Sequence, residues 1–259
     1  MPPVPASDRR RRTCLAPHTP KRLPPGPGRG TVEHMTTQRA LLLDVDGTLV
    51  DSTYVHVWTW VRALAEAGAP VPFVDVHRRI GKDGSTIVEE LLDIAGIDDD
   101  EERENIAGRA KDLHGEYYAE QAESLRVLPG ARDLVRGAKE QGWITVLATS
   151  APPSEFAEAR ELLDIDDYVD AVTTGEDVDR AKPDPTIVEI ALERSGVDAA
   201  DAVMVGDATW DAIAATKLGI RSVAVRTGGI GDSEFRDAGF SEIVDDAAAV
   251  LDLLTSGVL

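Results

Sequence analysis

Residues 41–49 read Leu41-Leu42-Leu43-Asp44-Val45-Asp46-Gly47-Thr48-Leu49. An apolar run that ends in two carboxylates and a glycine turn predicts a buried strand, with Asp44 and Asp46 on the same face at its carboxyl end. Burying two like charges costs free energy unless a cation or hydrogen bonds compensate. A bound divalent ion is one explanation of the pattern, and a calcium loop or a receiver-like acidic pocket are others.

Similar apolar runs follow along the chain and alternate with amphipathic stretches. The runs at 40–46, 144–149, 168–172, 202–205 and 222–225 predict buried parallel strands. Helices are predicted between them at about 130–141, 153–164, 184–195 and 209–218, several of them ended by Gly142, Gly196 or Gly219. This alternation predicts an α/β protein with a Rossmann-like, doubly wound parallel sheet, which binds its ligands outside the carboxyl ends of the strands.

The segment from Ser52 to Leu125 interrupts the alternation. Apolar residues recur there at helical spacing, at Val55, Trp58, Val61 and Leu64 and again at Ile87, Leu91 and Ile94. We therefore expect an all-helical cap domain over 52–125, inserted into a core formed by 36–51 and 126–259.

The aromatic residues and histidines of this insert have no pattern typical of a binding site. Trp58 and Trp60 are expected to pack between helices rather than to bind a ligand. His56, His77 and His114 stand isolated without metal-ligand spacing, so each is expected to be structural or exposed.

A second acidic pair follows another apolar run, in Val203-Met-Val-Gly206-Asp207-Ala-Thr-Trp-Asp211. Asp207 is expected at the same edge of the sheet as the first pair. Oxygen ligands from two strand ends, completed by water, are what Mg2+ prefers. Asp211, one helical turn later, is expected to support these ligands from behind rather than to bind the metal itself.

Two further segments supply an anion site at the same edge. Thr149 and Ser150 follow a predicted strand, where a hydroxyl group and backbone amides at a helix N-terminus can hold a phosphate. Lys182 adds a positive charge from a loop that Pro183 and Pro185 restrain.

The order and spacing of these segments resemble the four motifs of the haloacid dehalogenase-like superfamily. The motifs correspond to Asp44-Val-Asp46-Gly47-Thr48, then Thr149, then Lys182, then Gly206-Asp207 with Asp211. The resemblance covers about residues 39–259, in the subgroup of phosphoglycolate phosphatases and β-phosphoglucomutases, and it places 52–125 at that superfamily's helical cap.

The resemblance implies a magnesium-dependent phosphatase that hydrolyses small phosphate monoesters. Asp44 would attack phosphorus and form an aspartyl-phosphate, and Asp46 would act as general acid and base. Mg2+ would be held by Asp44, the Asp46 carbonyl and Asp207, while Thr149 and Lys182 hold the transferring group. Gly47, Thr48 and Ser150 are expected to contact the substrate as well. The expected partner is a small phosphorylated metabolite.

Several alternatives remain open at this stage. Dehalogenation is disfavoured, because members that cleave carbon–halogen bonds typically lack an acid at the position of Asp46. The loop Arg78-Arg-Ile-Gly-Lys82-Asp83-Gly84-Ser85 is no P-loop, and Lys82 either binds the substrate or belongs to a solvated turn. Gly84 stands where the mutases carry arginine. A phosphonatase using Lys82, a phosphosugar mutase, and a non-catalytic module that binds phosphate or a partner protein are the competing functions.

Composition narrows the class of partner. Residues 1–34 hold seven Lys and Arg against two Asp and Glu, which leaves 20 against 45 in the rest of the chain. The resulting net charge of −25 over residues 35–259 disfavours nucleic acid as a partner. No apolar run is long enough for a membrane span, and Cys14 is the only cysteine, so we expect a cytoplasmic protein. Residues 1–35, rich in Pro, Arg and Gly, are expected to be a disordered basic extension.

Overall fold

Six parallel strands form one sheet in the order β3-β2-β1-β4-β5-β6. The strands are β1 (Ala40–Leu43), β2 (Ile144–Ala148), β3 (Ala171–Thr173), β4 (Ala202–Gly206), β5 (Arg221–Val225) and β6 (Glu242–Val244). The computed structural model describes residues 38–178, 180 and 182–259. The predicted disordered extension over 1–35 lies outside the described residues.

Strand β1 lies in the middle of the sheet because all four of its side chains are apolar and fully buried. It pairs with β2 on one side and β4 on the other, with Leu41 opposite Thr145 and Val203. Successive side chains point to opposite faces, so Leu41 and Leu43 join one hydrophobic cluster while Ala40 and Leu42 join another.

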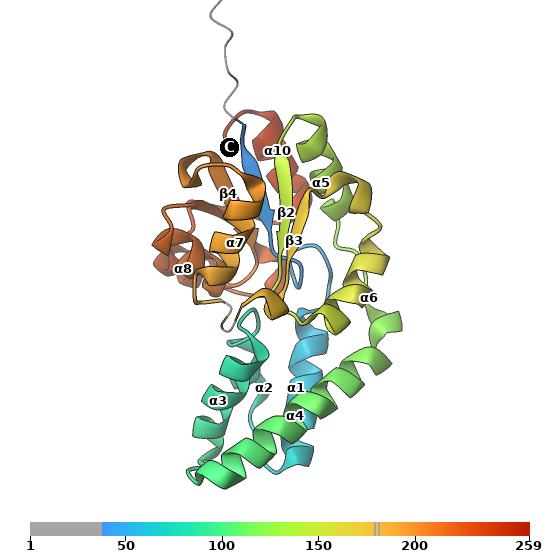
Figure 1. Ribbon diagram of the computed structural model, residues 1–259, viewed down its shortest axis with the longest axis vertical. Helices are drawn as coiled ribbons and strands as arrows, with labels where there is room; N and C mark the ends of the chain where they lie inside the picture. The colour runs from blue at the N-terminus through green and yellow to red at the C-terminus, as the bar shows by residue number, and fades with distance from the viewer. Residues whose placement is uncertain (1–37, 179, 181) are drawn as a thin grey trace, which may run out of the picture. The chain divides into compact units, whose positions relative to one another are not determined.

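Helices cover both faces of the sheet (Figure 1). Helices α5 (Ala131–Glu140), α6 (Pro153–Leu163) and α10 (Ala247–Thr255) contribute to the cluster of Leu41 and Leu43. Helices α7 (Thr186–Ser195) and α8 (Thr209–Lys217) pack on the opposite face, and α9 (Asp232–Ala238) packs against α8 through Phe235. The predicted doubly wound α/β sheet is therefore confirmed.

Four helices between β1 and α5 form the region called the cap below. They are α1 (Thr53–Ala67), α2 (Phe73–His77), α3 (Gly84–Ala95) and α4 (Asp100–Glu120). The cap has its own hydrophobic cluster, which includes Trp60, Leu64, Leu91 and Ile106. Contacts nevertheless join the cap and the sheet into one compact unit, so the predicted domain boundaries at Ser52 and Leu125 stay a prediction.

Two local predictions are wrong. The run at 168–172 is a strand only from Ala171 to Thr173, because residues 166–168 form a 3₁₀ turn that leads into it. The predicted inward stripe of the cap is right at Leu64, Ile87 and Leu91, which are buried. It is wrong at Trp58 and Ile94, which are 40% and 42% exposed, so Trp58 does not pack between helices as expected. Trp60 packs between helices as expected. Among the described residues, none of the helices has the length and apolar character needed to cross a bilayer.

Candidate active site

Asp44 and Asp46 lie where the chain leaves β1, at the carboxyl end of the central strand. The Asp44 amide still continues the sheet and donates to the Val205 carbonyl at 3.0 Å. The chain then turns sharply at Gly47, whose φ of +77° favours glycine. A Cβ on Gly47 would lie 2.1 Å from Asp207 Oδ2 and 2.2 Å from Thr53 Oγ1, so the turn also needs a residue without a side chain.

Three buried carboxylates meet at this end of the sheet: Asp44, Asp207 and Asp211. One oxygen atom from each lies within 4.8 Å of the others. The Thr48 hydroxyl bridges two of them, at 3.3 Å from Asp44 Oδ2 and 3.3 Å from Asp207 Oδ1. The predicted strand-end acids of β1 and β4 are therefore neighbours in space.

Lys182 is the cation of this group, and its side chain is fully buried. Its ammonium donates to Asp44 Oδ1 at 2.5 Å and to Asp211 Oδ1 at 2.8 Å. Asp211 Oδ2 accepts from the Ala208 amide at 3.1 Å, at the start of α8. Burial would lower the pKa of Lys182, but Asp211 and Asp44 outweigh it and raise the pKa above its ordinary value. Asp211 thus holds the ammonium in place, and its role as a support rather than a metal ligand stays a prediction.

The charges and the donor atoms of the group fit a divalent cation. Three carboxylates and one ammonium leave a formal charge of −2 in a buried site. Burial raises the pKa of Asp44 to about 7 although Lys182 opposes it, and burial with the Asp44 charge raises the pKa of Asp207 well above its ordinary value. An added cation would relieve this excess negative charge. The donor atoms of this group are carboxylate oxygens, which are hard ligands that suit Mg2+.

Asp46 belongs to a separate network that faces the cap. Its Oδ1 accepts from Ser52 Oγ at 2.7 Å and from His56 Nε2 at 3.2 Å, and its Oδ2 lies 3.4 Å from Thr149 Oγ1. Burial alone would raise the pKa of Asp46, but His56 and Ser52 hold it below its ordinary value. Burial disfavours the charged ring of His56, yet the Asp46 carboxylate raises the pKa of that histidine.

The hydroxyl residues after β2 lie where they were predicted, at the carboxyl end of that strand. Thr149 Oγ1 accepts from the Ala151 amide at 3.0 Å, at the entrance to α6. Ser150 Oγ donates to the Gly81 carbonyl of the cap at 3.1 Å. Ser150 therefore joins the sheet to the cap loop in addition to lining the site.

A cavity of about 590 Å3 opens onto this edge of the sheet. Its wall is shared by Asp44, Asp46 and Thr149 from the core and by residues of the cap, among them Lys82 and His114. This size lies within the usual range for small-molecule sites.

Lys82 lines the cavity wall and is not a solvated turn residue. Its side chain is only 6% exposed, and its ammonium lies 2.5 Å from Glu90 Oε1. The ammonium also lies 4.0 Å from the centre of the Trp210 ring, which belongs to the core. The solvated alternative is therefore wrong for Lys82, because Glu90 and Trp210 cover its charge, whereas Arg78 of the same loop is exposed.

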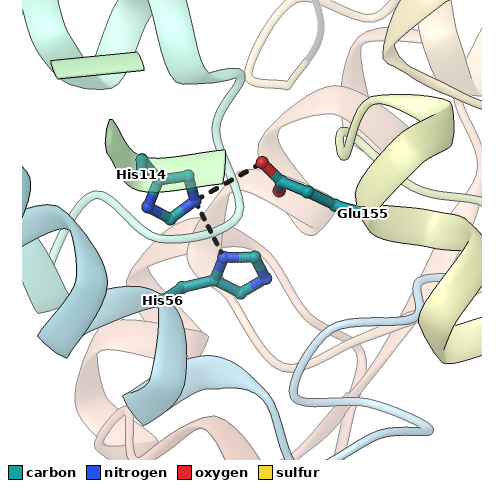
Figure 2. A group of neighbouring side chains, drawn as sticks. All are labelled: His56, His114 and Glu155. Atoms are coloured by element: carbon teal, nitrogen blue, oxygen red, sulfur yellow. Dashed lines mark hydrogen bonds and ion pairs between the residues drawn. The ribbon is translucent and has the colours of Figure 1, made fainter. Parts of the chain in front are cut away.

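The expectation that the cap histidines are isolated is wrong for two of them. His56 and His114 are stacked, with ring centres 5.4 Å apart, and Glu155 from α6 lies beside them (Figure 2). These residues are 58 and 41 positions apart in the sequence, so only the packing of α1, α4 and α6 brings them together. His77, by contrast, contacts the Gly228 carbonyl at 2.9 Å.

The site therefore contains most of the predicted residues and several others. Asp44, Asp46, Thr149, Lys182, Asp207 and Asp211 gather at one edge of the sheet, with Gly47, Thr48 and Ser150 beside them. Sequence reasoning missed His56, His114, Glu155 and Trp210. Of these four, only His56 could have been recognised from the sequence, because it stands one helical turn after Ser52 at the start of the helix that follows the first motif.

This fold and this arrangement of acids define a hydrolase of a known type. The model of the haloacid dehalogenase-like hydrolase family matches residues 38–219. The chain belongs to the haloacid dehalogenase-like hydrolase family.

Particular relatives narrow the position within the family. A phosphoglycolate phosphatase of Cupriavidus necator is 30% identical over 217 residues, which is 83% of this chain and 93% of the relative. A phosphorylated carbohydrates phosphatase of Thermotoga maritima is 30% identical over 188 residues, or 71% and 83% of the two chains. The crystal structure of a hydrolase from Pseudomonas syringae aligns with a TM-score of 0.77 and 27% identity, covering 85% of this chain and 99% of the other.

Solved structures of a phosphoglycolate phosphatase type and of a β-phosphoglucomutase type share the fold. The predicted subgroup, and the predicted enzyme class of a phosphatase of this family, are therefore confirmed.

Proposed function

We propose that the chain is a magnesium-dependent phosphatase that hydrolyses small phosphate monoesters through an aspartyl-phosphate on Asp44. The observation that carries this proposal is the position of Asp44, which is buried against Lys182 and lines the cavity. Together with Asp207, Asp211 and Lys182 it forms a group of formal charge −2. Asp44, the Asp46 carbonyl and Asp207 would hold Mg2+, which neutralises charge on the transferring phosphoryl group when bound.

The protein's own residues account for the remaining steps. Lys182 fixes Asp44 Oδ1, and Asp44 Oδ2, with the Thr48 hydroxyl 3.3 Å away, would attack phosphorus in line. Thr149 and Lys182 hold the oxygen atoms of the phosphoryl group, since both line the same edge as Asp44.

Asp46 is the group that moves protons. Its hydrogen bond from His56 keeps it ionised, which suits removal of a proton from the water that hydrolyses the aspartyl-phosphate. In the first step Asp46 must give a proton to the leaving oxygen. In its doubly protonated form, which its raised pKa favours, His56 can pass the Nε2 proton to Asp46 at 3.2 Å and remain as a neutral imidazole.

The cavity wall favours a hydroxylated leaving group over a carboxylate. Two lysines line it, and Lys82 already pairs with Glu90 while Lys111 donates to Ser85 Oγ at 2.8 Å. Five acidic residues line the same cavity outside the motifs: Asp83, Asp112, Glu116, Glu155 and Glu176. Because acids repel a second anionic group and accept hydrogen bonds from hydroxyls, we propose a phosphorylated sugar or polyol as the substrate rather than phosphoglycolate.

The competing functions have less support. A phosphonatase needs an uncharged lysine to form an imine, whereas the Lys82 ammonium is paired with Glu90. A mutase would need a cation at Gly84, where a Cβ would instead meet Trp60 at 3.3 Å. A non-catalytic module has no need for every motif acid, yet Asp44, Asp46 and Asp207 are all present.

The test is turnover of a panel of phosphate monoesters with and without Mg2+, for the wild type and Asp44→Asn. We expect magnesium-dependent release of phosphate, faster from sugar phosphates than from phosphoglycolate, and its loss by at least about three orders of magnitude in Asp44→Asn. Asp51→Asn is the matched control, because Asp51 is exposed on the same loop. Equal turnover by wild type and Asp44→Asn would refute the proposed nucleophile, and preference for phosphoglycolate would refute the proposed substrate class.

A further inference from the structure

Three side chains that commonly bind transition metals meet at the cavity wall, outside the carboxylate group of Asp44. They are His56 of α1, His114 of α4 and Glu155 of α6 (Figure 2). His56 Nδ1 lies 3.4 Å from His114 Nε2, and His114 Nε2 lies 3.6 Å from Glu155 Oε1. One ligand atom from each of the three residues therefore lies within 4.8 Å of the other two.

The hydrogen bonds on the far side of His114 allow the tautomer that a metal ligand needs. The Thr59 hydroxyl lies 2.9 Å from the Val55 carbonyl and 3.0 Å from the His56 carbonyl and can donate its proton to either. Thr59 Oγ1 then accepts from His114 Nδ1, which lies 3.0 Å away. In this tautomer the Nε2 of neutral His114 carries a lone pair.

Asp46 fixes one proton of His56. His56 Nε2 faces Asp46 Oδ1 at 3.2 Å, and a carboxylate can only accept, so Nε2 carries a proton. Neutral His56 then has its lone pair on Nδ1, 3.4 Å from His114 Nε2, and a metal ion would take the place of the second proton that the raised pKa of His56 favours there. Stacking holds both rings in place, with Trp60 3.9 Å from His114 and Tyr118 4.4 Å from His56 between ring centres.

We propose that His56 Nδ1, His114 Nε2 and Glu155 Oε1 bind one transition-metal ion of the Zn2+ type. Bonds of about 2.0–2.1 Å to a tetrahedral ion place its ligands roughly 3.4 Å apart, close to the two separations of 3.4 Å and 3.6 Å from His114 Nε2. The His56 and Glu155 atoms lie within 4.8 Å of each other. Two imidazole nitrogens select Zn2+, Co2+ or Ni2+ over Mg2+. The fourth ligand position can be taken by water, because all three residues line the cavity.

The residues behind the histidines strengthen this assignment. Metal-binding imidazoles usually donate their other N–H to a carboxylate or a similar acceptor, which orients the ring. Asp46 does this for His56, and Thr59 does it for His114. The site therefore has both its ligands and their supports.

An ion bound here would connect the cap to the core, since α1 and α4 belong to the cap and α6 packs on the sheet. It would also hold His56 in its hydrogen bond to Asp46. We therefore expect Zn2+ to inhibit turnover by keeping the cap closed. This consequence rests on the proposed function, whereas binding of the ion does not.

The experiment titrates Co2+ into the full chain in the presence of excess Mg2+ and follows visible absorption. A four-coordinate ion with nitrogen ligands absorbs strongly, and a six-coordinate ion among oxygen ligands absorbs weakly, so the spectrum separates this site from the carboxylate group. We expect a strong band that saturates at one equivalent and disappears when Zn2+ is added. Glu155→Gln and His114→Gln should each weaken binding by at least about tenfold.

Glu158→Gln is the matched control, because Glu158 is exposed on the same helix as Glu155. It should bind Co2+ like the wild type. Glu155 is only partly buried, so its variant is expected to fold even if the His114 variant does not. A weak band only, or binding that is unchanged in Glu155→Gln, would overturn the proposal. Inhibition by Zn2+ that Glu155→Gln abolishes would support the cap closure, and equal inhibition of both proteins would refute it.

Discussion

At the scale of single residues, the carboxylate group depends on three glycines that press against it. A Cβ on Gly47 or on Gly228 would lie 2.1 Å or 1.9 Å from Asp207 Oδ2, and one on Gly206 would lie 2.2 Å from Asp211 Oδ2. These contacts are shorter than any side chain tolerates. The Asp207 and Asp211 carboxylates thus occupy the space that a side chain on any of these glycines would need. We therefore expect a single added methyl group to disturb the site.

Gly47→Ala tests that expectation. The alanine Cβ must displace Asp207 or Thr53, so we expect magnesium affinity to fall by at least about tenfold and turnover to fall with it. The positive φ adds about 1–2 kcal/mol of backbone strain. Isothermal titration calorimetry with Mg2+ and urea unfolding measure the two effects separately.

Gly219→Ala is the control for strain alone. Its φ of +73° is close to that of Gly47, but a Cβ there would meet no heavy atom of the described residues within 4 Å. It should lose similar stability from strain and keep magnesium affinity. If Gly47→Ala bound Mg2+ as tightly as Gly219→Ala, the close packing around Asp207 would not matter to the site.

At the scale of elements, one carboxylate joins β2, β3 and α5. Asp170 precedes β3, and its Oδ2 accepts from the Thr145 amide of β2 at 2.9 Å. Lys139 of α5 forms an ion pair with the same carboxylate. Burial alone would raise the pKa of Asp170, but Lys139 and Thr145 outweigh it and hold the pKa below the ordinary 3.8.

The lowered pKa has a consequence for stability. A carboxyl whose pKa is lower in the folded chain stabilises the fold above its unfolded pKa, and that contribution disappears as the pH falls through the folded pKa. We expect Asp170→Asn to lower the free energy of unfolding at pH 6 and to have a smaller effect at pH 3. Urea unfolding of both proteins at each pH gives the difference. The account of Asp170 is wrong if that difference does not shrink in acid.

Most of the helices and strands were predictable, because apolar runs and helix-ending glycines are features of the local sequence. The apolar run at 40–43 is long enough for one buried strand, and glycines such as Gly142 and Gly196 mark where helices end. The side of a cap helix that faces inward was not predictable in the same way. Trp58 and Trp60 are both apolar, and only the packing of α1 against α4 decides that Trp60 is buried.

At the scale of the whole molecule, the cap meets the core around the cavity. Ser150 Oγ donates to the Gly81 carbonyl, and His77 contacts the Gly228 carbonyl. Lys82 of the cap loop lies over Trp210, which stands between the motif acids Asp207 and Asp211. Such contacts join segments distant in sequence. The motif acids could therefore be predicted from their strand ends, and Lys82 from its loop, while His114 of the cap could not.

Trp210→Leu tests whether the contact with Lys82 helps to close the cap. Removing the ring should cost roughly 1 kcal/mol of closure, which corresponds to about a fivefold rise in KM. The turnover number should change little, because Asp44 and Asp46 are not touched. Steady-state kinetics on the best substrate measure both constants. Trp58→Leu, at an exposed site on α1, should leave KM unchanged, and an equal rise in both variants would argue against a specific role for Trp210.

The most direct test of the central claim is to look for the phosphoryl group on Asp44. Asp46→Asn should form the aspartyl-phosphate with an activated aryl phosphate and hydrolyse it slowly, because the base for the second step is missing. The protein is quenched in acid within one turnover, digested and analysed by mass spectrometry. We predict one added phosphoryl group on the peptide that contains Asp44, dependent on Mg2+ and absent when Asp44→Asn is combined with Asp46→Asn. A phosphoryl group on another residue, or turnover by the wild type with no phosphorylated protein under any quench time, would contradict the account.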